Sequence, residues 1–264
     1  LGQEFSGYGT QIKNAVRRLK DQEKWLKELP IGGTALGTGI NSHKDFAKIT
    51  IQEISDYTGV DFIQAPNLFE AIATKDGIVS FAGALNTLSV SLMKIANDLR
   101  LLSSGPRCGI GEITLPSLQP GSSIMPGKVN PVIPEATIQV AAQVMGICHT
   151  ITISGSSGLL DLNVMMPVMA ENLIYALRIL NNITCHLQML CIDGIKANLE
   201  RCNELVEWSM AIVTPLATKI GYDKAAEIAY KAFNEKKTVK SVVAEMAILS
   251  DEELESLFDP RNMI

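Results

Sequence analysis

The chain has 264 residues, of which 47% are hydrophobic and 5% aromatic, and its formal net charge at pH 7 is −5. This length allows one large domain, or one with a small second domain, and the composition argues against intrinsic disorder. Scattered Lys and Arg in an acidic chain argue against a nucleic-acid partner, because such binding depends on clustered basic residues. Abundant Ala, Leu, Ile and Met favour helices over a β-sandwich.

The cysteines and the apolar runs further restrict the class of protein to which this chain can belong. The chain has five cysteines, an odd number without C-x-x-C spacing, which argues against a zinc site and a disulfide framework. We interpret them as buried free thiols of a reducing compartment. No apolar run looks long enough to cross a bilayer and no signal peptide is visible, so no membrane partner is expected. The chain starts with Leu1, and we interpret it as a fragment that lacks its N-terminal part.

The first third of the chain has two expected helices. Apolar side chains at helical spacing predict a helix over residues 2–29, ended by Pro30. A glycine-rich connection follows over residues 31–41. A second helix is expected over residues 44–57, with Asn41 or Ser42 as its N-cap.

The strongest structural signal lies between residues 68 and 103. Apolar residues recur there at spacings of three and four, which predicts an unbroken helical seam. The seam consists of Ile78, Phe81, Leu85, Leu88, Leu92, Ile95, Leu99 and Leu102. Small residues between them allow close helix packing, and a seam this long needs partners on more than one side. We therefore predict a long-helix bundle that extends across subunits.

The remainder divides into a long loop, two long helices and several short ones. Residues 104–131 lose all periodicity and are rich in chain breakers, which predicts a functional loop. Long helices are expected over 132–151 and 167–191, with Pro167 in the first turn of the second. The short helices are expected over 224–235, 239–249 and 251–258, with Thr238 and Ser250 as N-caps and a capping box from Ser250 to Glu253.

These elements predict an all-α fold. Its central long-helix bundle would span residues 1–213 and carry the loop 104–131. A small C-terminal helical domain would span residues 214–264.

The chemistry is concentrated in residues 121–131, which read Gly-Ser-Ser-Ile-Met-Pro-Gly-Lys-Val-Asn-Pro. The breakers exclude a helix or a regular strand, and two hydroxyls, an ammonium and an amide are suited to hold a small anion. A serine can act as a base only as an alkoxide or through a relay, and nearby positive charge and N–H donors lower that cost. Each residue alone has an ordinary reading, as a turn serine or a solvated lysine. The hypothesis rests on the ordered string.

This string resembles the signature loop of the fumarase/aspartase superfamily. Other stretches resemble that family in the same order, namely residues 1–4, 33–41, 94–100 with 104–107, and 162–164 with Pro167, so the resemblance covers essentially the whole chain. It implies an enzyme, a lyase, that removes a proton from the carbon next to a carboxylate of a C4 dicarboxylate. An aci-carboxylate intermediate would then lose water or ammonia from the β-carbon.

The resemblance also implies roles for individual residues. Ser122 would be the catalytic base, and Glu135 would polarise the catalytic histidine. The substrate would be bound by Ser123, Lys128, Val129 and Asn130. The catalytic histidine of the family lies upstream of the stretch that resembles residues 1–4, and His43, His149 and His186 do not match it, so we expect them to be structural or exposed.

The resemblance further implies an assembly and a location. No metal or cofactor is implied. The family's usual assembly is a homotetramer whose sites are shared between chains, and the expected location is the cytoplasm, or the mitochondrion in a eukaryote.

Local sequence favours one reaction over another. Residues 32–34, 105–113, 220–226 and 259–263 are closer to class II fumarases, whereas residues 131–135 are closer to aspartases. We therefore expect reversible hydration of fumarate to malate, by a carbon-oxygen lyase. The alternatives are an aspartate ammonia-lyase, which converts aspartate to fumarate and ammonia, and an inactive helical scaffold. The chain by itself is expected to be inactive, because the histidine is missing.

Overall fold

The computed structural model describes residues 1–259 and 262, and these residues form eleven α-helices, two 3-10 turns and four two-residue strands. The all-α prediction is confirmed. The chain divides into two compact units, one of residues 1–103 with 115–195 and one of residues 104–114 with 196–264. The resemblance of residues 259–263 involves Pro260, Arg261 and Met263, which lie outside the described residues.

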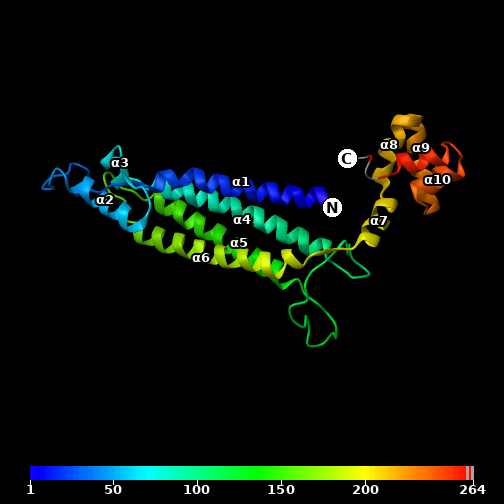
Figure 1. Cartoon of the computed structure of the whole chain (residues 1–264), viewed down its shortest axis with the longest axis horizontal. Helices are drawn as coiled ribbons and strands as arrows, with labels where there is room; N and C mark the ends of the chain where they lie inside the picture. Colours follow the sequence, from blue (N-terminus) through cyan, green and yellow to red (C-terminus); the bar gives the residue numbers. More distant parts are fainter. Residues whose placement is uncertain (260–261, 263–264) are drawn as a thin grey trace. The chain divides into compact units, whose positions relative to one another are not determined.

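The first unit is a bundle of four long helices that run alternately up and down (Figure 1). They are α1 (Gly2–Leu26), α4 (Asp76–Leu102), α5 (Val132–Gly155) and α6 (Met166–Leu190). Helix α4 contacts both α1 and α5, and α5 also contacts α6. The antiparallel pairing of α1 with α4 is visible in its hydrogen bonds, since Tyr8 contacts Asp98 whereas Gln22 contacts Ser80.

The predicted seam forms the inner face of α4. Leu85, Leu92, Ile95, Leu99 and Leu102 are buried, and their burial supplies the hydrophobic stabilisation of the bundle. The rest of the inner face consists of small buried residues, which let neighbouring helices approach closely. These are Ala82, Ala84, Ser89, Ser91 and Ala96. Ser89 and Ser91 satisfy their hydroxyls within α4 by donating to carbonyl oxygens four residues earlier.

The helical segment from residue 68 is broken, and the prediction of one continuous element was wrong there. Helix α3 (Leu68–Ala73) ends before α4, and Thr74 is extended. The Lys75 ammonium donates to the carbonyl oxygens of Ile72 and Thr74, at 3.0 and 2.8 Å, and so caps the end of α3. Burial lowers the pKa of Lys75.

Several further boundaries differ from expectation. Helix α5 continues to Gly155 instead of residue 151, and α10 (Val239–Glu245) ends four residues before the expected residue 249. Helix α1 ends at Leu26 because β1 (Glu28–Leu29) pairs in parallel with β2 (Ile63–Gln64). Helix α2 (Phe46–Thr58) begins after Asp45, and no side chain caps it, so the prediction of Asn41 or Ser42 as its N-cap was wrong.

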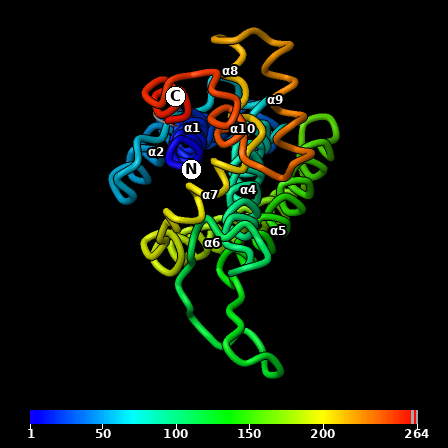
Figure 2. Tube along the Cα trace, turned by 90° about the vertical axis from the view of Figure 1, so that its right-hand side faces the viewer, coloured from blue at the N-terminus to red at the C-terminus, as the bar shows by residue number. Residues whose placement is uncertain are grey.

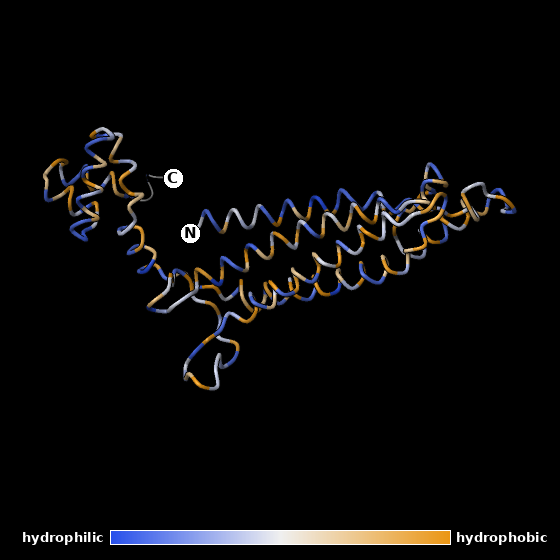
Figure 3. The backbone as a smooth tube through the Cα atoms, turned by 180° about the vertical axis from the view of Figure 1, so that it is seen from behind, coloured by the Kyte–Doolittle hydropathy of each residue, from blue (hydrophilic) through white to orange (hydrophobic). Residues whose placement is uncertain are grey.

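The second unit consists of short helices around its own core. They are α7 (Leu199–Trp208), α8 (Val213–Ile220), α9 (Tyr222–Glu235), α10 (Val239–Glu245) and α11 (Asp251–Leu257), with a 3-10 turn at Met210–Ile212. Strand β3 (Ile113–Thr114) pairs antiparallel with β4 (Lys196–Ala197). Figure 3 shows how apolar and polar residues alternate along these helices. Thr238 caps α10 and Ser250 forms the capping box with Glu253, so both cap predictions are confirmed.

The core of the second unit begins at Ile212 and continues to Phe258. The predicted domain boundary between residues 213 and 214 falls at the start of α8, inside this unit. The division of the chain into domains 1–213 and 214–264 therefore stays a prediction.

By length and hydropathy alone, α4 and α5 could each cross a membrane, which the sequence interpretation did not expect. Small and hydroxylated residues interrupt the large apolar ones in both helices, so neither helix contains a long continuous apolar run although its mean hydropathy is high. Both helices contribute buried residues to the bundle and contact each other there, and core helices commonly meet the same criterion.

A buried asparagine joins α5 to α6. Asn163 is 0% exposed, and its amide nitrogen donates to the carbonyl oxygens of Ser154 and Gly155, at 3.0 and 3.3 Å, at the end of α5. Its side-chain oxygen accepts from the backbone N–H of Met165, at 2.8 Å, directly before α6. One side chain therefore satisfies groups at two helix ends that burial would otherwise leave unpaired.

We predict that Asn163→Ala lowers the free energy of unfolding by about 1–3 kcal/mol, because buried backbone groups lose their partner. Urea unfolding of the chain measures this change. The matched control is Asn182→Ala at an exposed position of α6, which should stay within about 0.5 kcal/mol of the unchanged chain. Equal effects of the two variants would contradict the role given to Asn163.

Candidate active site

The predicted loop leaves the bundle and returns to the first turn of α5, as Figure 2 shows in green. Its segment 121–130 closes on itself at a neck formed by Gly121, Lys128 and Asn130. The Gly121 N–H donates to the Lys128 carbonyl oxygen, and the Asn130 side-chain amide donates to the Gly121 carbonyl oxygen, both at 2.7 Å. A Cβ at residue 121 would collide with the Lys128 carbonyl group, so only glycine allows this close approach.

Ser122 lies directly after the neck, and its hydroxyl oxygen is held by two donors. The backbone N–H groups of Ile124 and Met125 each donate to Ser122 Oγ at 3.1 Å. Hydrogen bonds of this kind stabilise negative charge on the oxygen, which is the property that a serine base requires. Gly127 has φ of +77° and completes the turn that brings Lys128 back toward the neck.

Ser122 and Lys128 line one hollow of about 540 Å³. Its other lining residues are Ser117, Leu118, Gln119, Pro120, Gly127 and Val129. Lys128 is exposed, and within the described part of the chain its ammonium has no carboxylate partner. The hollow therefore combines a positive charge with an oxygen that is prepared to carry negative charge.

The structure brings three of the six predicted site residues together in this hollow, namely Ser122, Lys128 and Val129. Ser123 is exposed on the loop outside the lining, and Asn130 directs its amide to Gly121. Glu135 lies half-buried in the first turn of α5.

Ser117 and Gln119 were missed by the sequence interpretation. Loss of periodicity marked their stretch as a loop but could not show which of its side chains face the hollow.

None of the three histidines lines this hollow. His43 is 73% exposed, and its Nδ1 accepts from the backbone N–H of Asp45 at 3.2 Å. His149 on α5 and His186 on α6 are exposed as well. These positions agree with the expectation that the histidines of this chain are exposed or structural.

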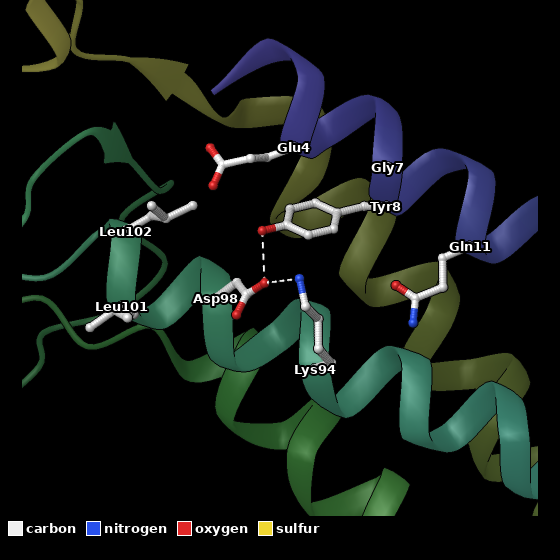
Figure 4. Close-up of a pocket in the computed structure, with 8 residues that line it drawn as sticks. All are labelled: Glu4, Gly7, Tyr8, Gln11, Lys94, Asp98, Leu101 and Leu102. Carbon is white, nitrogen blue, oxygen red and sulfur yellow. Dashed lines mark hydrogen bonds and ion pairs between the residues drawn. The ribbon is translucent and has the colours of Figure 1, made fainter. Parts of the chain in front are cut away.

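A second hollow of about 460 Å³ lies between α1 and α4 (Figure 4). Asp98 is at its centre, where it accepts a hydrogen bond from the Tyr8 hydroxyl at 2.8 Å and forms an ion pair with Lys94. The Lys94 ammonium also lies 4.4 Å from the centre of the Tyr8 ring. Because the charges of Asp98 and Lys94 compensate each other, we interpret this cluster as a junction between helices.

The junction changes the acidity of its members. Burial and the hydrogen bond to Asp98 raise the pKa of the Tyr8 hydroxyl. Burial also opposes the charge of Asp98, but hydrogen bonds from Lys94 and Tyr8 and the charge of Lys94 outweigh it, so the pKa of Asp98 lies below its ordinary value. The ionised form of Asp98 is therefore part of the folded state.

Within the described residues, no group of three metal-ligating side chains is present.

Comparison with known families agrees with the resemblance. Residues 1–146 match the family model described as Lyase, and residues 212–264 match the model described as Fumarase C C-terminus. The chain belongs to this lyase family. The predicted membership of the fumarase/aspartase superfamily is thus confirmed.

Individual relatives of this lyase chain carry fumarase names. The whole chain aligns with "Fumarate hydratase, mitochondrial" from Dictyostelium discoideum at 48% sequence identity, and the alignment covers 54% of that relative. It also aligns over its full length with "Fumarate hydratase class II" from Rickettsia bellii at 48% identity, and that alignment covers 57% of the relative. The class II fumarase from Schistosoma mansoni has a solved structure that matches the whole chain and 58% of its own, with a TM-score of 0.95 and 36% identity. The chain spans about half the length of the curated relatives it matches.

We predict that Asp98→Asn reduces stability at pH 7 by about 0.5–1 kcal/mol, through loss of a partly exposed ion pair. A lowered folded-state pKa stabilises the fold above the ordinary pKa of an aspartate, about 3.9, and this contribution disappears as pH falls through the folded value. Urea unfolding between pH 7 and pH 3 should show the two proteins converging at acidic pH. Asp21→Asn, at an exposed position of α1, is the control, and a difference that is constant with pH would contradict the linkage.

Proposed function

We propose that the protein to which this chain belongs catalyses the reversible hydration of fumarate to malate. One observation carries the proposal: Ser122 Oγ accepts two backbone N–H bonds in a hollow that it shares with Lys128, whose ammonium has no carboxylate partner among the described residues. The family, and relatives named fumarate hydratase at 48% identity, support the reaction type.

In the direction of dehydration, Ser122 as alkoxide takes the proton from the carbon next to one carboxylate of malate. Two N–H donors reduce the cost of that alkoxide, and the nearby Lys128 charge reduces it further. The electron pair released from carbon moves into the carboxylate, which becomes a doubly charged aci-carboxylate. Lys128 would pair with this group and stabilise it most where its charge is greatest. The electron pair then returns from the aci-carboxylate to form the carbon–carbon double bond of fumarate, and the β-hydroxyl group leaves as hydroxide, which a proton from solvent converts to water.

The other predicted residues complete the proposal. Ser123, Val129 and Asn130 would contact the substrate when the loop closes on it, and Glu135 would orient a histidine that acts as its partner. In this chain His43, His149 and His186 lie outside the lining of the hollow, so we expect the isolated chain to be inactive.

We also propose a homotetramer whose sites are shared between chains. Exposed apolar side chains on the long helices support it, because they would be covered by other copies. They include Val90, Ile153, Ile174, Leu177 and Met189. The proposed location is the cytoplasm, or the mitochondrion in a eukaryote.

The second candidate is aspartate ammonia-lyase, which the likeness of residues 131–135 to aspartases favours. The loop chemistry is common to both reactions, because it acts on the proton and the carboxylate and not on the leaving group. A test must therefore examine the leaving group.

The full-length product of the gene should consume fumarate, measured by its ultraviolet absorbance, in buffer without ammonia. Loss of absorbance only when ammonia is present would replace the proposal by aspartate ammonia-lyase. No loss under either condition would favour a scaffold role.

We predict that Ser122→Ala in the full-length protein lowers kcat by about 10²–10⁴-fold, the usual contribution of a general base. Steady-state kinetics with malate measures this loss. The adjacent Ser123→Ala is the matched control, because its hydroxyl accepts no such pair of N–H bonds, and it should raise KM more than it lowers kcat. Similar kcat values for Ser122→Ala and the unchanged enzyme would reject Ser122 as the base.

A further inference from the structure

The neck of the loop contains a residue for which another role was predicted. Asn130 was expected to bind substrate, yet its side-chain amide donates to the Gly121 carbonyl oxygen at 2.7 Å. The Gly121 N–H donates in turn to the Lys128 carbonyl oxygen at 2.7 Å. Both polar groups of one glycine are therefore held by the far end of the same loop.

We propose that Asn130 is a positioning residue for Ser122. The carbonyl group that Asn130 holds belongs to the peptide unit that joins Gly121 to Ser122, so the hydrogen bond restricts the orientation of this unit. Ser122 then starts from a fixed backbone position, from which its Oγ reaches the N–H groups of Ile124 and Met125 at 3.1 Å. The importance of this position for catalysis rests on the proposed function, whereas closure of the neck does not.

Two features of the neck support this assignment. A Cβ at residue 121 would collide with the Lys128 carbonyl group and approach Asn130 N to 2.9 Å, so the two chain segments are in tight contact. Asn130 is also less exposed than Ser123 and Lys128 on the same loop. A carboxamide has two N–H donors, so one can hold the neck while the second remains available for a substrate carboxylate.

The test is hydrogen exchange of backbone amides in the chain without substrate, read at Gly121, Ile124 and Met125. Asn130→Ala should speed exchange at these amides by about five-fold, the equivalent of one hydrogen bond worth about 1 kcal/mol. Gly121→Ala should do the same with Asn130 intact, because the added methyl group forces the neck apart. Ser123→Ala is the control and should leave the three rates unchanged.

Asn130→Asp adds a readout that general loosening would not change. An ionised carboxylate repels the Gly121 carbonyl oxygen, whereas a protonated carboxyl group can donate to it. The exchange rates of Asn130→Asp, taken relative to Asn130→Ala at the same pH, should therefore fall as pH drops below about 4, the ordinary range of an aspartate pKa. Circular dichroism at each pH verifies that the helices persist.

Kinetics of the full-length protein connect the neck to the base. Gly121 has no side chain that could touch substrate, so Gly121→Ala should lower kcat while KM changes less. Amide exchange rates in Asn130→Ala equal to those of the unchanged chain would overturn the proposal. A ratio of the Asn130→Asp rate to the Asn130→Ala rate that does not change with pH would overturn it as well. Because exchange is measured without substrate, failure of fumarate hydration would reject the proposed function and leave the neck result standing.

Discussion

The structure depends on the close packing of α4 against α5. Small buried residues along α4, among them Ala82, Ala84, Ser89 and Ala96, allow its neighbouring helices to approach, and the larger seam residues between them fill the interior. Because α4 and α5 run in opposite directions (Figure 1), the end of one lies at the same end of the bundle as the start of the other. The start of α5 is therefore held by a packed core, and the loop before it has a rigid base.

The loop itself is organised by short-range contacts. It buries little apolar surface, and Ile124 at its tip is 86% exposed. Its order comes from the neck at Gly121 and from the two N–H bonds to Ser122, all within ten residues. Such a design leaves the reactive serine accessible to a small substrate while the serine keeps a defined conformation.

Structural features with a periodic or local sequence pattern were predicted well, whereas contacts between residues far apart in the sequence could not be predicted. The α4 seam, the caps Thr238 and Ser250 and the reactive loop all have local signatures, because each depends on neighbours within a few positions. The break at Thr74 is also local, since the Lys75 ammonium donates to carbonyl oxygens one and three residues earlier, but the residue pattern does not indicate it. The junction of Tyr8 with Asp98 joins residues 90 positions apart, and nothing in either local pattern indicates it. Five of the six predicted site residues lie in one ordered string and Glu135 follows it, but their division into lining and neck required coordinates.

Two backbone N–H donors hold the Ser122 hydroxyl oxygen and prepare it to carry negative charge. Amide exchange at Ile124 and Met125, compared between the unchanged chain and Ser122→Ala, tests this arrangement most directly. We expect exchange about five-fold faster at both amides in the variant, with exchange at Gly121 unchanged, because the hydrogen bond from Gly121 to Lys128 remains. Equal exchange rates at Ile124 and Met125 in the two proteins would contradict it.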